Sequence, residues 1–527
     1  MSADGWWRGA VIYQIYPRSF LDTNGDGVGD LKGITAKLGY VKSLHVDGIW
    51  LSPFVASPMR DFGYDVSDYC DVDPLFGTLK DFDALLETAH RLDLKVITDQ
   101  VWSHTSSDHP WFAESRTNRT NEKSDWYVWA DARPDGSPPN NWQAWFGGPA
   151  WTWEPRRRQY YLHNFLPSQP QLNIRAAGVR SAILETARFW LNRGVDGFRL
   201  DVANYYAHDL QLRDNPPSGD PAPALPRDMQ MHLYNSNQPE ALEFVERLRN
   251  LVDSYKDRMM VGELAPGSFD LMAEYTRGDQ RLHTAYAFDF LKAWPGTAGF
   301  VDIVSCWQDR PGEGWPSWAF SNHDVARVVT RWGEAIGAPP GRAAPLFLSL
   351  LLSLRGTVFL YQGEELGLPE GEVPLEKLQD PWGIAGWPAT KGRDGCRTPM
   401  PWKEAPNGGF TRAKEPWLPV DARQRLMSVD KQERLTESML HTARALVAVR
   451  QESVALRTGA SKARDEAGVL VIEREAPGEH MLCVFNLTPA AVTRPCGSAK
   501  VVWAADAVLA SGKLHMEPFG SAILKLG

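Results

Sequence analysis

Short apolar runs rich in Val, Ile, Leu, Phe and Tyr alternate with longer amphipathic stretches over most of the chain. Such alternation is typical of repeated βα units around a parallel sheet. Helical spacing is clear between the runs, for example in the apolar residues Phe82, Leu85 and Ala89. Eight runs predict strands, at residues 11–16, 48–52, 95–100, 197–202, 259–263, 285–289, 318–322 and 357–361. The pattern therefore predicts an α/β fold, a (β/α)8 TIM barrel.

Three stretches depart from this rhythm and predict additions to the barrel. Residues 104–172, rich in Trp, Pro, Asn and Gly, predict a small domain inserted after the third strand. Residues 364–429, rich in Pro and Gly, predict a long loop after the eighth strand. Residues 454–527 show strand patterns without helices, which predicts a C-terminal antiparallel β domain. The barrel itself would then comprise residues 1–103 and 173–453.

Charge and cysteine content narrow the classes of partner. The chain has 56 Lys and Arg against 65 Asp and Glu, a net charge of −9, and no basic block, which disfavours a nucleic acid partner. Its 5 Cys form no CxxC pair, so neither a disulfide framework nor a zinc site is indicated, and we expect reduced thiols in a cytoplasmic protein. No signal-like start and no apolar stretch of about 18 residues occurs, so we expect no membrane partner.

Polar residues stand at the ends of several predicted strands. The carboxyl ends of barrel strands carry the active site, so these residues would share one rim. A single Asp at a strand end is more often a helix cap or a solvated loop residue, but four strand ends together indicate a site. The residues concerned are Asp99, His104, Arg199, Asp201, Glu263, His323 and Asp324.

Clustered carboxylates that need neither a metal nor a cysteine suit glycoside hydrolysis, in which one group attacks and another protonates the leaving oxygen. Arg199 stands two residues before Asp201 and would point to the same face of a strand. Its guanidinium would keep Asp201 ionised, as a nucleophile requires. Glu263 lies in the sparsely charged VGELAPG, where an apolar setting would raise its pKa and suit a general acid. The alternative for Glu263 is a structural hydrogen-bonding role.

Ordered motifs spanning nearly the whole chain give a resemblance to a known family. They are WWRGAVIYQIYPRSF, DGIWLSPF, DFGYDVSDY, DQVWSHTS, SQPQLN, GVDGFRLDVAN, VGEL, FSNHD, LYQGEELG and RTPMPW. The chain resembles the α-amylase superfamily, glycoside hydrolase family 13, in particular its α-glucosidase and oligo-1,6-glucosidase branch. The resemblance implies a retaining mechanism, with Asp201 as the nucleophile, Glu263 as the acid/base and Asp324 as the third carboxylate, which distorts the sugar.

The resemblance also implies the substrate contacts. His104 and His323 would hydrogen-bond glucose hydroxyls, and Tyr64 would stack on the glucose ring. As in exo-acting members, a charged pair of Asp61 and Arg397 would close the pocket over the non-reducing end. The other residues implied to contact substrate or to orient the nucleophile are Phe146, Phe165, Arg199 and Val202.

Linkage and substrate length are indicated by two further features. Branch members with Val after the nucleophile, as at Val202, tend to accept α-1,6 links, although Val202 could equally be ordinary barrel packing. The Pro-rich loop at residues 204–240 resembles an insertion in bacterial α-glucosidases that favours short substrates. We expect an exo-acting retaining α-glucosidase that acts on α-1,4 links, α-1,6 links or both, in disaccharides and short oligosaccharides.

Three alternative functions share this fold. A transglucosylase, or a sucrose-active isomerising enzyme, would use the same carboxylates, and sequence separates them poorly from a hydrolase. A non-catalytic homologue, such as a transporter heavy chain, lacks the carboxylates and carries a membrane anchor, so we disfavour it. The expected partner is a small carbohydrate, and the expected state is a monomer or homodimer.

A loop with half the pattern of an EF-hand follows the first strand. DTNGDGVGD offers oxygen ligands at Asp22, Asn24, Asp26, the Val28 carbonyl and Asp30. The twelfth position of the pattern is Gly33 rather than Glu, and a turn without metal is the alternative. The resemblance implies a structural divalent cation here, calcium or else magnesium, and no organic cofactor. A family calcium site that uses an Asn before His104 is not expected, because Ser103 stands there.

Overall fold

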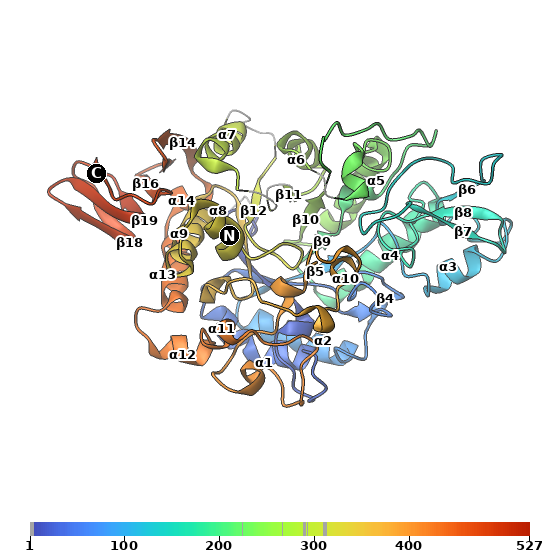
Figure 1. The fold of residues 1–527 in the computed structure, drawn as a ribbon, viewed down its shortest axis with the longest axis horizontal. Helices are drawn as coiled ribbons and strands as arrows, with labels where there is room; N and C mark the ends of the chain where they lie inside the picture. The colour runs from blue at the N-terminus through green and yellow to red at the C-terminus, as the bar shows by residue number, and fades with distance from the viewer. Residues whose placement is uncertain (1–4, 224, 266, 288–290, 292–293, 309–313) are drawn as a thin grey trace.

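The computed structural model describes residues 5–223, 225–265, 267–287, 291, 294–308 and 314–527. Its centre is a sheet of eight parallel strands, in the order β11-β10-β9-β5-β2-β1-β13-β12 (Figure 1). A parallel bridge between Ala285 and Pro316 joins the two end strands and nearly closes the barrel. The strands are β1 (Val11–Ile15), β2 (Gly48–Leu51), β5 (Lys95–Gln100), β9 (Gly197–Leu200), β10 (Met259–Leu264), β11 (Thr284–Ala287), β12 (Ser317–Ala319) and β13 (Thr357–Tyr361).

The predicted (β/α)8 barrel is confirmed, because each of the eight predicted runs overlaps one of these strands. Residues 288 and 289, at the end of the sixth predicted run, lie outside the described residues. The helices around the barrel are α1 (Leu31–Lys42), α2 (Leu79–Arg91), α4 (Ala177–Arg193), α5 (Pro239–Asp253), α6 (Phe269–Thr276), α7 (Gly296–Gln308), α8 (Val328–Ile336), α9 (Pro340–Ser353) and α13 (Met439–Glu452).

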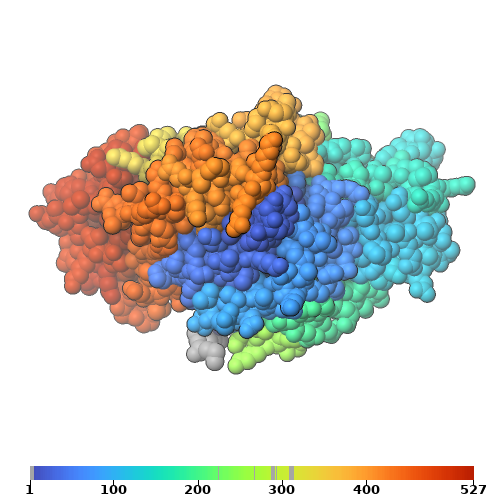
Figure 2. All heavy atoms as spheres, turned by 90° about the horizontal axis from the view of Figure 1, so that it is seen from below, coloured from blue at the N-terminus to red at the C-terminus, as the bar shows by residue number. Residues whose placement is uncertain are grey.

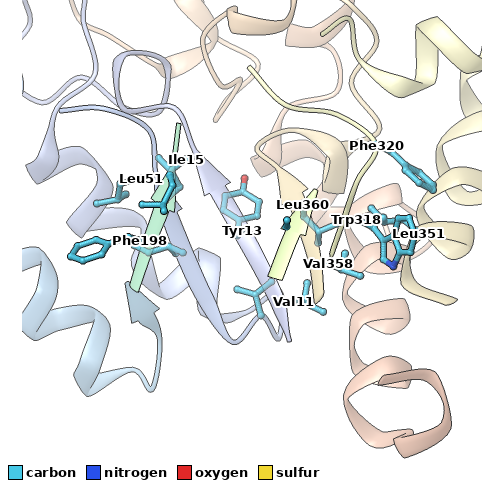
Figure 3. Close-up of a cluster of buried hydrophobic side chains, with 14 of the residues drawn as sticks. Val11, Tyr13, Ile15, Leu51, Phe198, Trp318, Phe320, Leu351, Val358 and Leu360 are labelled. Carbon is cyan, nitrogen blue, oxygen red and sulfur yellow. The ribbon is translucent and has the colours of Figure 1, made fainter. Parts of the chain in front are cut away.

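Side chains that alternate along the strands build two layers of core. Val11, Tyr13 and Ile15 point outward into the cluster that packs strands against helices (Figure 3). The intervening Ile12 belongs to a second cluster inside the barrel, together with Trp50 and other residues. Because side chains alternate with period two, the inner face also carries the polar residues at the strand ends.

Local signals in the sequence set the ends of several helices. The Asp30 side chain accepts a hydrogen bond from the Gly33 amide at the start of α1. Thr78 and Asp81 form a capping box at the start of α2. Gly194 ends α4 with a φ of 101°, a conformation that glycine adopts without the strain that a Cβ brings.

The inserted segment after β5 folds as a small antiparallel sheet in the order β6-β8-β7. Its elements are α3 (Pro110–Ser115), β6 (Trp129–Ala130), β7 (Trp151–Glu154) and β8 (Gln159–Leu162). A two-stranded ribbon of β3 (Val55–Ala56) and β4 (Asp68–Val72) follows β2. The long loop after β13 carries short helices, α10 (Pro381–Gly386), α11 (Ala422–Arg425) and α12 (Val429–Arg434).

The predicted C-terminal antiparallel sheet is also confirmed. It follows α14 (Val454–Thr458) and has six strands. They are β14 (Ala460–Glu466), β15 (Val469–Ala476), β16 (Glu479–Asn486), β17 (Val492–Pro495), β18 (Lys500–Ala510) and β19 (Lys513–Lys525). The C-terminal sheet and the inserted segment lie at opposite ends of the molecule (Figure 2). The division into domains by residue number stays a prediction.

Within the described ranges, no single helix is long and apolar enough to cross a membrane. In the same ranges, α8 and α9 taken together reach that length and composition, and they are bent by 106° from each other. The apolar residues of α9 are buried in the protein core.

Candidate active site

The register of the barrel strands brings the predicted catalytic residues together. Asp99 on β5 lies opposite Arg199 on β9, and Arg199 lies opposite Val261 on β10. Asp201 and Glu263 each follow two residues later, so they reach the same height on the same inner face. Both side chains line one pocket at the carboxyl ends of the strands. The spacing of residues along three separate strands therefore creates the site.

Most of the predicted substrate residues line this pocket as well. They are Asp61, Tyr64, His104, Phe146, Phe165, Val202 and Asp324. Arg199, His323 and Arg397 lie behind the lining and are 0 % exposed. Each is hydrogen-bonded to residues of the lining. Arg199 bonds to Asp201 and Glu263, His323 bonds to Tyr64, and Arg397 bonds to Asp324.

Arg199 joins three buried carboxylates rather than Asp201 alone. Its Nη1 donates to Asp99 Oδ1 at 2.8 Å and to Asp201 Oδ1 at 2.7 Å. Its Nη2 donates to Glu263 Oε2. The expectation of a guanidinium dedicated to Asp201 was too simple, because the parallel register places all three acids around one side chain. One positive charge therefore faces three acidic groups.

Burial and Arg199 act in opposite directions on the two candidate catalytic acids. Burial raises the pKa of Glu263 to about 8, although Arg199 favours its ionised form. Burial also raises the pKa of Asp201, to about 7, again against the effect of Arg199. The order of the two values leaves Glu263 as the group that keeps its proton at higher pH. The pKa of Glu263 is raised, as expected. Asp201 is less readily ionised than the neighbouring Arg199 alone would predict.

Val202, directly after Asp201, has an unusual backbone. Its φ of 36° and ψ of 53° are left-handed, which is costly for a β-branched residue. In this conformation the Val202 amide donates to Glu263 Oε2 at 3.2 Å. The turn after β9 thus supplies a backbone donor to the candidate acid/base.

Asp324 differs from the other two carboxylates because cations surround it. Arg393 Nη1 lies 3.1 Å and Arg397 Nη2 lies 2.9 Å from Asp324 Oδ1. Burial alone would raise the pKa of Asp324, but His323, Arg393 and Arg397 outweigh burial and hold it well below its usual range. Asp324 is therefore ionised throughout the pH range in which Asp201 and Glu263 titrate.

The predicted pair of Asp61 and Arg397 is wrong, because Asp61 pairs with Arg393 instead. Arg393 Nη2 lies 2.7 Å from Asp61 Oδ1, and the same atom lies 2.9 Å from Asp380 Oδ1. Arg397 turns toward Asp324 and the His323 carbonyl, which its Nε reaches at 2.7 Å. The short helical turn at Asp394–Arg397 separates the two arginines and points them to different partners.

Two histidines, His104 and His323, contact Tyr64 at the pocket. Burial lowers the pKa of His104 to about 4, and it lowers that of His323 well below its usual value, so both rings are neutral near pH 7. The Tyr64 hydroxyl donates to Asp99 Oδ2 at 3.0 Å, and its ring stacks on His323 at 5.2 Å between centroids. His104 Nε2 lies 2.9 Å from the Tyr64 carbonyl. Neutral imidazoles suit hydrogen bonds with uncharged hydroxyls.

Several pocket residues were missed from sequence. They include Trp145, Gln169, Arg227, Asp228, Trp382 and Arg393. Gln169 stands in the motif SQPQLN and its Nε2 donates to Asp61 Oδ2 at 3.0 Å, so the motif itself was a usable signal. Arg393 stands four residues before Arg397 in one loop, and nothing in the local pattern distinguishes the two roles.

The acidic loop after β1 uses its carboxylates as turn caps in this structure. Asp22 accepts from the amides of Gly25 and Gly27 at 2.7 and 2.8 Å. Asp30 accepts from the Gly33 amide at 2.7 Å. In the described ranges, no three acidic, histidine or cysteine side chains converge closely enough to hold a metal ion. The all-oxygen donor set, which also includes Asn24 and the Val28 carbonyl, fits a hard cation in chemistry, and the cation stays a prediction.

Comparison with known proteins places this geometry in a family. Residues 14–459 match the model of the α-amylase catalytic domain. The chain belongs to the α-amylase family. The predictions of this family and of a glycoside hydrolase are thereby confirmed.

Individual relatives of the family are similar over almost the whole chain. A probable α-glucosidase of Rhizobium meliloti (strain 1021) is 52 % identical, over 93 % of this chain and 90 % of its own length. An oligo-1,6-glucosidase of Heyndrickxia coagulans is 37 % identical, over 92 % of each chain. Among solved structures, the α-glucosyl transfer enzyme XgtA superimposes with a TM-score of 0.93 at 52 % identity, over 99 % of both chains.

Proposed function

We propose that the protein is an exo-acting retaining α-glucosidase that releases glucose from the non-reducing end of disaccharides and short oligosaccharides. The observation that carries the proposal is the Arg199 cluster, in which Asp201 and Glu263 share one guanidinium and face one pocket. Two carboxyl groups with separated pKa values are what this chemistry needs. The relatives named α-glucosidase and oligo-1,6-glucosidase support the same substrate class.

In the first step, the ionised Asp201 attacks the anomeric carbon and forms a glucosyl ester, while the carbon to oxygen bond to the leaving group breaks. Glu263 gives its proton to that oxygen, so the leaving group departs as a neutral alcohol. In the second step, the ionised Glu263 removes a proton from water, which attacks the same carbon and frees Asp201. Asp324, held ionised by Arg393 and Arg397, would accept hydrogen bonds from the glucose hydroxyls.

Exo-action is proposed from the closed end of the pocket. The buried pair of Asp61 and Arg393 would meet the terminal 4-hydroxyl, because a carboxylate accepts and a guanidinium donates hydrogen bonds. A glucose inside a polymer has no free 4-hydroxyl to offer. Single glucose units should therefore be released from short sugars, and starch should be a poor substrate.

Azide rescue tests the roles of the two carboxyl groups. Asp201→Asn and Glu263→Gln should each abolish turnover of p-nitrophenyl α-glucoside without loss of the fold. With an activated donor and azide, the Asp201 variant should form β-glucosyl azide, because azide replaces the nucleophile. The Glu263 variant should form the α-azide, because azide attacks a glucosyl-enzyme already formed on Asp201. The same anomer from both variants would refute the assignment.

Transglucosylation is the second candidate, and one observation favours it. The α-glucosyl transfer enzyme with 52 % identity shares the fold over 99 % of both chains. Transfer would use the same glucosyl-enzyme, but a sugar or alcohol would take the place of water. Chromatography of products from maltose, isomaltose and sucrose would distinguish the two outcomes. Free glucose alone indicates hydrolysis, whereas new oligosaccharides or sucrose isomers indicate transfer.

A further inference from the structure

The outer wall of the pocket is built by three segments that are far apart in the sequence. Trp145 comes from the inserted segment after β5. Arg227 and Asp228 belong to a short helical turn, Pro226–Met229, within the loop of residues 204–240. Trp382 belongs to α10 of the long loop after β13. All four line the same pocket as Asp201 and Glu263.

Arg227 is held firmly in this wall. Its guanidinium carbon lies 4.3 Å from the centre of the Trp145 ring and 5.2 Å from that of Trp382. Its Nη1 donates to the Trp145 carbonyl at 2.7 Å, and its Nε lies 3.4 Å from Asp228 Oδ1. The Arg227 side chain is 11 % exposed. Its Nη2 has no hydrogen-bond partner in the part of the chain that the structure describes, so a donor is left for a ligand.

The loop that carries Arg227 is fixed on the inserted segment. The His232 ring stacks on Trp145 with 6.1 Å between centroids and 16° between planes. His232 Nε2 also lies 3.0 Å from the Arg227 carbonyl, and Trp145 Nε1 donates to the Tyr205 hydroxyl at 2.8 Å. These contacts place Arg227 before any ligand arrives, which reduces the entropy lost on binding.

We propose that Arg227 and Asp228 bind the hydroxyls of a neutral second sugar, the leaving group of the cleaved disaccharide. This inference rests on the proposed function and names the residues that select its leaving group. Arg227 offers a donor and Asp228 an acceptor side by side, which matches a pair of neighbouring sugar hydroxyls. The indole ring of Trp382 offers a flat apolar surface beside them for the face of the sugar ring.

Charge argues for a neutral sugar rather than a phosphorylated one. Asp228 lies beside Arg227 and offsets its positive charge. The other acidic groups of the pocket lining are Asp61, Asp201, Glu263 and Asp324, and the other arginine is Arg393. A phosphate dianion in the outer pocket would therefore meet more negative than positive charge.

The test compares two kinds of glucosyl donor that differ in the leaving group, disaccharides and α-glucosyl fluoride. Maltose and isomaltose place a sugar against the outer wall, whereas fluoride leaving from α-glucosyl fluoride makes no such contact. Arg227→Ala should lower kcat/KM for the disaccharides by about tenfold to a hundredfold, the effect of one lost charged hydrogen bond. Its kcat/KM for α-glucosyl fluoride should stay within twofold of the wild type.

Arg213→Ala is the matched control on the same loop. Arg213 pairs with Asp209 at 2.9 Å, stacks on Tyr234 and has a half-exposed side chain outside the pocket lining. Arg213→Ala should leave kcat/KM unchanged for the disaccharides and for α-glucosyl fluoride. An equal loss on both donors for Arg227→Ala, an unchanged rate on disaccharides, or the same selective loss for Arg213→Ala would overturn the proposal.

Two further outcomes separate the inference from the proposed function. Faster turnover of trehalose 6-phosphate than of maltose by the wild type would overturn the neutral class of leaving group. Failure of the wild type to hydrolyse α-glucosyl fluoride would overturn the proposed glucosidase itself, because that donor needs only the two catalytic acids, Asp201 and Glu263, and the glucose-binding part of the pocket.

Discussion

At the scale of single residues, one guanidinium organises the chemistry. Arg199 is fully buried and contacts Asp99, Asp201 and Glu263. Three acids around one cation cannot all ionise readily in a buried site, because the charges repel one another and water is excluded. Burial therefore raises the pKa of both catalytic candidates, to about 7 for Asp201 and about 8 for Glu263, although Arg199 favours their ionised forms.

The pH dependence of kcat/KM should follow these two groups. Asp201 must be ionised, so the rate should fall as pH drops below about 7. Glu263 must be protonated, so the rate should fall as pH rises above about 8. Glu263→Gln, assayed with α-glucosyl fluoride, should keep the acid limb and lose the alkaline limb. An optimum near pH 5 in the wild type would contradict this assignment.

Arg393 should prove essential to the closed end of the pocket. Arg393→Ala leaves Asp61 and Asp380 buried without their shared cation, which costs about 3–5 kcal/mol of stability. We expect kcat/KM for maltose to fall at least a hundredfold. The control is Arg423→Ala, since Arg423 pairs with Asp421 on the same long loop but has a half-exposed side chain. An Arg393 variant that cuts maltose at the normal rate would refute the closed-pocket model.

At the scale of elements, loops rather than barrel strands complete the pocket. The inserted segment supplies Trp145, Phe146 and Phe165, and α10 supplies Trp382. Hydrogen bonds tie the loop of residues 204–240 to the inserted segment, for example from Trp142 Nε1 to the Arg213 carbonyl at 2.9 Å. The loops of a barrel vary, whereas its strands keep their geometry. The loops therefore determine the substrate specificity of a shared scaffold.

The acidic loop after β1 should affect stability more than catalysis. If a divalent cation binds Asp22, Asn24, Asp26 and Asp30, chelation should lower the melting temperature by a few degrees. The initial rate at 25 °C should change little, because none of these residues lines the pocket. Asp26→Ala should remove the effect of the chelator, and added calcium should reverse that effect only in the wild type. Immediate total loss of activity with an intact fold would contradict a structural role.

At the scale of the whole molecule, two buried arginines bind carbonyls at the end of α9, and one of them, Arg474, comes from the C-terminal sheet. Arg450 on α13 donates to the carbonyls of Leu352, Leu354 and Gly356, at the end of α9 and just beyond it, at 2.5–2.9 Å. Arg474 on β15 donates to the Ser353 carbonyl at 2.5 Å. Burial lowers the pKa of both to about 9, so they remain charged near pH 7. They satisfy backbone groups that the end of α9 would leave unpaired.

Removal of one of these arginines should destabilise the molecule as a whole. Arg450→Met leaves several buried carbonyls without a donor, which costs about 3 kcal/mol or more. The thermal unfolding midpoint at a fixed scan rate should fall, while kcat of the folded enzyme stays unchanged. Arg434→Met is the control, because Arg434 is exposed and its ion pair with Asp430 contributes little. Equal midpoints for the two variants would refute this role.

The sequence alone determined the barrel, the C-terminal sheet, the family and the rim of strand-end residues. These follow from local properties: period-two alternation, helical spacing and ordered motifs depend on near neighbours in the chain. Asp201 and Glu263 could be found in this way because each stands at a fixed position relative to a strand.

Only the tertiary structure decided which residues pair. Arg393 rather than Arg397 binds Asp61, Arg199 serves three acids, and Arg227 reaches the pocket from a loop without periodicity. Such partners come from segments separated by up to 332 positions. Their contacts depend on loop paths and on competition among buried charges, and neither is set by residue type or local spacing.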